Sequence, residues 1–193
     1  MKILQISDTH GLHRQLADLP AADVIVHCGD FTEAGTEEEV LDFLNWFAEL
    51  PYAHKIFVAG NHDLCLWDAG GIEDLPEGMH FLQDCGCEID GVCFFGLGYN
   101  HPETLIPDAV DVLVTHEPPV MILDRSTGVH WGKCFPAQPS VRNQPPLSSF
   151  RSRSRKLRNS PQIRHNLLQR LPPRRCPPPC PPAPPAGTGV GAL

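Results

Sequence analysis

Four short stretches of this 193-residue chain carry side chains that can bind divalent metal ions. They read Asp8-Thr9-His10-Gly11, Gly29-Asp30, Gly60-Asn61-His62-Asp63 and Thr115-His116-Glu117-Pro118-Pro119. Carboxylate oxygens and neutral imidazoles suit hard to borderline divalent metals. A carboxylate beside a glycine, as at Asp30, can offer one oxygen to each of two ions. Two metals about 3.5–4 Å apart can clamp a phosphate and activate a bridging water, so these residues would suit a two-metal centre that binds a phosphate.

Each stretch directly follows a short apolar segment that is rich in β-branched residues. These segments cover residues 3–6, 24–28, 56–59 and 112–114, and their composition and length are typical of buried strands. Open α/β sheets place their ligand crevice at the carboxyl ends of the strands. We therefore expect the four stretches to meet at one edge of the fold.

Helical and hairpin signals lie between and after these strands. Thr36 and Glu39 form a capping-box pattern, and the apolar residues that follow at helical spacing predict a helix over residues 36–50, ended by Pro51. Residues 13–19 predict a weaker helix. Residues 79–98 predict a β-meander with strands at 80–82, 87–89 and 92–95, the last two joined by an Asp90-Gly91 turn. Strands of both directions imply a mixed sheet.

In this order, the motifs resemble those of the calcineurin-like metallophosphoesterase superfamily, which run D-x-H, G-D, G-N-H-[DE], H and finally G-H-x-H. The resemblance covers residues 1 to about 132 and is to the small cytosolic-type branch. It implies an α/β fold, a four-layer α/β/β/α sandwich with mixed sheets. It also implies a centre of two divalent metals (Mn, Fe or Zn) that hydrolyses phosphomonoesters or phosphodiesters by a metal-bridging hydroxide.

The resemblance assigns a role to each metal-capable side chain. Asp8 and His10 would hold the first metal, and Asp30 would bridge the two metals. Asn61 and His116 would hold the second metal.

Two further residues would act in catalysis, and the last family motif is missing. His62 would protonate the leaving oxygen as a general acid. Asp63 would orient His62, or it caps a turn. The sequence contains no G-H-x-H, and the only histidines after His116 are His130 and His165. Both metals would then lack one histidine ligand, which predicts a C-terminally incomplete domain and impaired activity.

Charge divides the chain into two parts. Residues 1–132 contain four basic and all 23 acidic residues, a net charge of −19, whereas residues 133–193 carry +11. This change predicts a phosphoesterase domain at 1–132 and a disordered basic Pro/Arg/Ser-rich tail at 133–193. A shifted reading frame or a misjoined exon after Gly132 would explain it, and translating the genomic DNA downstream of codon 132 in the other frames is the check.

The tail leaves two non-catalytic alternatives open. Its arginines could bind nucleic acid phosphates, and residues 175–181 fit the R-x-x-P-x-x-P pattern of ligands for SH3-like domains. We rank both below a small phosphoester substrate as the partner.

Location and packing give a few more expectations. No secretory signal and no apolar run of about 18 residues is evident, so we expect a cytoplasmic protein without a membrane partner. Cys28, Cys65 and Cys93 are expected to be buried, reduced thiols. His27 should pack inside its strand, whereas the histidines expected at the surface are His13, His54, His80 and His101.

Overall fold

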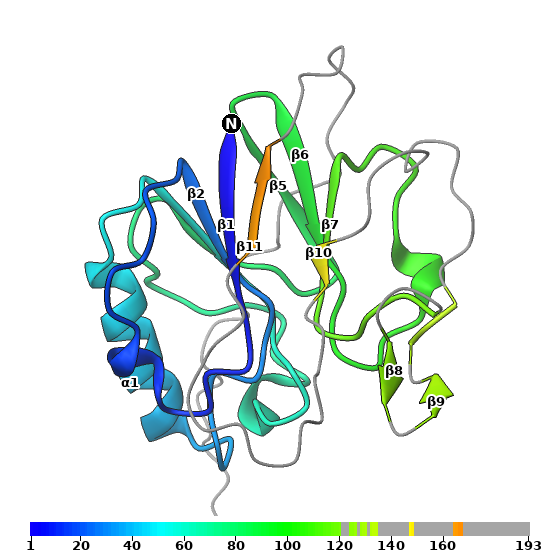
Figure 1. Ribbon diagram of the computed structural model, residues 1–193, viewed down its shortest axis with the longest axis horizontal. Coiled ribbons are helices and arrows are strands. Elements are labelled where there is room, and N and C mark those ends of the chain that lie inside the picture. The colour runs from blue at the N-terminus through cyan, green and yellow to red at the C-terminus, as the bar shows by residue number, and fades with distance from the viewer. Residues whose placement is uncertain (121–123, 127, 131, 135–146, 149–163, 168–193) are drawn as a thin grey trace, which may run out of the picture.

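The computed structural model describes residues 1–120, 124–126, 128–130, 132–134, 147–148 and 164–167 (Figure 1). Its first sheet has five strands in the order β11-β1-β2-β3-β4. The parallel strands are β1 (Lys2–Ile6), β2 (Val24–His27), β3 (His54–Phe57) and β4 (Met79–Phe81). At the edge, β11 (Arg164–Leu167) runs antiparallel to β1.

The second sheet has four strands in the order β10-β7-β6-β5. The hairpin of β5 (Cys85–Ile89) and β6 (Val92–Gly96) is antiparallel, and both residues of its Asp90-Gly91 turn have positive φ angles, 51° and 74°. β7 (Val112–Thr115) pairs in parallel with β6, and β10 (Leu147–Ser148) pairs in parallel with β7. A separate hairpin joins β8 (Arg125–Ser126) to β9 (Val129–His130).

The helix α1 (Glu37–Glu49) begins at the expected capping box. The Thr36 hydroxyl accepts a hydrogen bond from the Glu39 N–H, and the Glu39 carboxylate accepts one from the Thr36 N–H. Two residues of its expected apolar face, Val40 and Phe47, are buried, but Leu41 is exposed. Short 3₁₀ turns form the rest of the described helical structure: η1 (His13–Gln15), η2 (Leu64–Leu66) and η3 (Glu103–Leu105).

Three apolar clusters define the layers. Alternate residues of β1 and β2, such as Leu4 and Ile25, pack against α1, and the residues between them, such as Ile3, pack against the second sheet. The outer face of the second sheet packs against the segment around η3. The described residues therefore form α, β and β layers, with α1 outside the first sheet (Figure 1), in agreement with the α/β class and mixed sheets.

Several expectations differ from the structure. The β-meander is wrong, because β4 pairs with β3 in the first sheet and only β5 and β6 form the hairpin. The helix expected over residues 13–19 is the single turn η1. The sequence predicts a disordered tail at 133–193, whereas the described residues of this part include the strands β10 and β11.

Side-chain burial also corrects some predictions. His27 is fully buried as expected, but His13 is buried too, since it packs against Phe43 and Trp46 of α1. Cys65 is exposed, and Cys93 is disulfide-bonded rather than a reduced thiol. Among the described residues, the helices are all too short or too polar to span a bilayer.

Candidate metal centre

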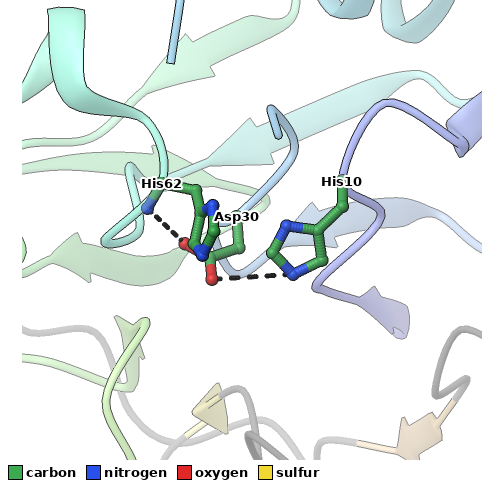
Figure 2. A group of neighbouring side chains, drawn as sticks. All are labelled: His10, Asp30 and His62. Carbon is green, nitrogen blue, oxygen red and sulfur yellow. Dashed lines mark hydrogen bonds and ion pairs between the residues drawn. The ribbon is translucent and has the colours of Figure 1, made fainter. Parts of the chain in front are cut away.

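The metal-capable side chains gather where the strands of both sheets end. The described residues contain two groups of possible ligand atoms. Within each group, all the ligand atoms lie within 4.8 Å of one another. One group contains His10, Asp30 and His62, which Figure 2 shows converging from three separate loops. The other contains Asp8, Asp30 and His116. Asp30 belongs to both, as a carboxylate that bridges two ions must.

Asn61 lies beside the second group. Its side-chain oxygen is 3.0 Å from Nε2 of His116, so these two expected ligands of one metal are adjacent. The grouping differs in one respect from the roles inferred from the sequence. Asp8 lies with His116, and His10 lies with His62, whereas the resemblance assigned Asp8 and His10 to the same ion.

Each of the three histidines is held by a backbone carbonyl at its Nδ1 atom. The acceptors are the carbonyls of Thr32 for His10 (3.2 Å), Glu33 for His62 (2.8 Å) and Cys28 for His116 (2.8 Å). A carbonyl can only accept, so Nδ1 is the donor in each of these hydrogen bonds, and Nε2 is the ring nitrogen left to face the site. This arrangement is typical of metal-binding histidines.

Asp30 is fully buried, and its two oxygens have different surroundings. Oδ1 accepts a hydrogen bond of 2.8 Å from the N–H of His62. Oδ2 is buried and has no hydrogen-bond partner, although Nε2 of His10 lies 3.8 Å away. Burying a carboxylate oxygen without a hydrogen-bond donor costs free energy. A cation bound between the two groups of ligand atoms would remove that cost. Burial also raises the pKa of Asp8, because it disfavours the charged carboxylate. A bound cation would favour the charged carboxylate and lower this pKa again.

Two glycines allow the loops to approach this closely. A Cβ atom on Gly60 would lie 2.3 Å from Oδ1 of Asp30, and one on Gly29 would lie 2.8 Å from Nδ1 of His116. Gly29 also has a φ angle of +90°, which other residues rarely adopt. Both glycines are therefore required by the packing of the site itself.

Asp63 does not orient His62, which corrects the role inferred from the sequence. Its buried carboxylate accepts hydrogen bonds from the N–H groups of Asp30 (2.8 Å), Gly60 (2.8 Å) and Thr32 (3.0 Å) and from the Thr32 hydroxyl (2.8 Å). The ring of His62 is held by the Glu33 carbonyl instead. Asp63 thus ties the loop after β2 to the loop after β3.

Sequence reasoning missed an aromatic pair beside the site. The ring of Tyr99 lies 6.0 Å from that of His116 and 5.4 Å from that of Trp67. Tyr99 follows β6, which is parallel to β7. Ligand sites of α/β sheets lie at the carboxyl ends of the strands, so a search of the residues that follow β6 would have identified Tyr99. His130, by contrast, is exposed and its Nδ1 lies 2.7 Å from Oδ1 of Asp124. The two groups of ligands among the described residues do not include it.

This arrangement defines a class of protein. The family model described as calcineurin-like phosphoesterase matches residues 1–134, and the chain belongs to this family. It is 35% identical to the UPF0046 protein K07C11.7 of Caenorhabditis elegans, over 68% of this chain and 56% of that protein. It is 34% identical to human metallophosphoesterase domain-containing protein 1, over 62% of this chain and 49% of that protein. The chain thus spans about half the length of these relatives.

Proposed function

We propose that this chain is a metal-dependent phosphoesterase that hydrolyses phosphomonoesters or phosphodiesters. The observation that carries the proposal is the buried carboxylate of Asp30, which belongs to both groups of ligand atoms and whose Oδ2 has no hydrogen-bond partner. The residues that would hold two divalent ions (Mn, Fe or Zn) are Asp8, His10, Asp30, Asn61 and His116. When bound, such ions supply charge stabilisation for the phosphate and an activated water.

His62 is the proposed general acid. Its Nδ1 donates to the Glu33 carbonyl, so the proton that it transfers to the leaving oxygen must sit on Nε2, the nitrogen that faces the site. The backbone N–H of His62 also donates to Oδ1 of Asp30. His62 therefore fixes the position of the proposed acid relative to the proposed bridging carboxylate of Asp30.

We further propose that hydrolysis by this chain is slow. The sequence has no G-H-x-H, so each metal would lack one of the family's histidine ligands. Losing an outer-shell partner of a metal ligand typically costs about 10–100-fold in affinity or activity, and losing a ligand should cost at least as much. Purified protein should therefore hydrolyse aryl phosphates weakly or not at all with Mn²⁺. Robust turnover that His62→Ala abolishes would contradict this expectation.

The alternative is a non-catalytic protein that binds nucleic acid or an SH3-like partner through the tail. The residues that suggest it, 151–158 and 175–181, lie outside the described residues. Salt-dependent binding of an isolated tail peptide to nucleic acid would support the first form of this alternative.

Calorimetric titration with Mn²⁺ tests the metal centre. Asp30→Asn removes the charge of the proposed bridge with little change in shape and should weaken binding by at least about tenfold. Asp108→Asn removes an equal charge from an exposed position and should leave binding unchanged. Equal affinities for the wild type and Asp30→Asn would refute the assignment of Asp30.

A further inference from the structure

The loop after β1 carries two proposed metal ligands with a buried threonine between them. We propose that Thr9 and His27 position Asp8 and His10 for metal binding, through the hydrogen bond between the Thr9 hydroxyl and the His27 ring. The inference rests on the proposed function, because it concerns the same metal centre. Neither Thr9 nor His27 would touch the metal, so both are positioning residues.

The backbone of this loop needs outside support. Asp8 and His10 have φ angles of 55° and 42°, a left-handed region that residues other than glycine seldom occupy. Such conformations persist only where the surrounding structure holds them. Main-chain hydrogen bonds from Asp8 to Gly29 and from His10 to Asp30, each 3.0 Å long, hold one side of the loop.

The Thr9 side chain provides a further anchor, between the two proposed ligands. It is buried, and its Oγ1 lies 3.0 Å from Nε2 of His27. A rotation of the loop that carried Asp8 or His10 away from the site would move Thr9 as well and break this hydrogen bond. The contact therefore couples the two flanking side chains to a residue of β2.

His27 is suited to this role because it cannot follow such a movement. It is fully buried in β2, and its ring packs edge-to-face against Phe31, Phe43 and Phe47 at centroid distances of 5.7, 5.1 and 6.4 Å. Close-packed aromatic rings of this kind resist displacement. The Thr9 hydroxyl is thus tied to the core between the first sheet and α1.

The test compares the Mn²⁺ affinity of full-length variants by calorimetry. Thr9→Val keeps the shape of the side chain and removes the hydroxyl, and it should weaken binding about 10–100-fold, the typical effect of losing such a partner. Thr9→Ser keeps the hydroxyl and should bind Mn²⁺ more like the wild type than like Thr9→Val. Tyr52→Phe removes a hydroxyl that donates to the Pro20 carbonyl outside the metal centre and should leave the affinity unchanged.

The melting temperature of the metal-free proteins separates positioning from a general loss of stability. Thr9→Val should lower it no more than Tyr52→Phe does, while only Thr9→Val loses Mn²⁺ affinity. If Thr9→Val does not fold, Thr9→Ala, which adds no bulk, replaces it with the same expected loss.

Unchanged affinity in Thr9→Val or Thr9→Ala, or an equal loss in Thr9→Ser, would overturn this inference and leave the metal centre standing. A wild-type protein that binds no Mn²⁺ would instead overturn the proposed function, and the inference with it.

Discussion

The replacement of Asp63 by Asn should destabilise the fold more than its single-atom change suggests. The carboxylate accepts two N–H donors at Oδ2, from Asp30 and Gly60, and one N–H and one hydroxyl at Oδ1, both from Thr32. The Thr32 hydroxyl can rotate to accept a hydrogen bond from an amide. The three backbone N–H groups cannot, so the amide of Asn must face at least one of them in either orientation.

The magnitude follows from this geometry. One buried N–H without an acceptor costs about 1–3 kcal/mol, and each remaining hydrogen bond weakens by about 1 kcal/mol when its acceptor loses the charge. The smaller desolvation cost of the neutral amide offsets part of this loss. We therefore expect Asp63→Asn to lower the free energy of unfolding by about 2–4 kcal/mol, a large share of the usual total of about 5–15 kcal/mol.

Urea denaturation in the presence of a chelator measures this change without any contribution from bound metal. The control is Asp68→Asn, which removes a nearby carboxylate that is exposed. Manganese affinity should also fall in Asp63→Asn, because the loops that carry Asp30 and Gly60 lose their common anchor. A loss of stability below about 1 kcal/mol, the value of an ordinary neutral hydrogen bond, would refute the reasoning.

Three further predictions concern single residues. Gly60→Ala places a Cβ 2.3 Å from Oδ1 of Asp30 and should cost about 1–3 kcal/mol together with Mn²⁺ affinity, whereas Gly70→Ala, with nothing within 4 Å of its Cβ, should bind Mn²⁺ normally. Thr36→Ala removes the N-cap of α1 and should lower the free energy of unfolding by about 1 kcal/mol; no change in the urea midpoint would contradict the capping role. Burial lowers the pKa of His27 well below its usual 6.5, so below that pH the unfolded chain binds a proton that the folded chain does not. Stability should be complete above about pH 6.5 and decline as the pH falls toward 5.5, and His27→Gln should show a smaller decline; equal slopes would contradict this account.

The sequence determined the local elements and the composition of the site. The capping box and the helical spacing that follows it set the position of α1, because both depend on residues a few positions apart. Asp90-Gly91 fixed the β5–β6 hairpin in the same way. The metal-capable residues could be predicted because each follows a short buried strand, and strand ends converge at one edge of an α/β fold.

Only the tertiary structure decided which segments and side chains meet. Nothing in residues 79–81 shows that they pair with β3 rather than with β5, because that choice depends on long-range packing between the two sheets. Two of the three residues that donate to Asp63, Asp30 and Thr32, and the carbonyls that hold the three histidine rings lie 22 to 88 residues away along the chain, so no local pattern encodes these contacts. The sequence thus identifies the candidate ligands, while the packing of two sheets sets which donor atoms lie beside Asp30 and which nitrogen of each histidine faces the candidate metal centre.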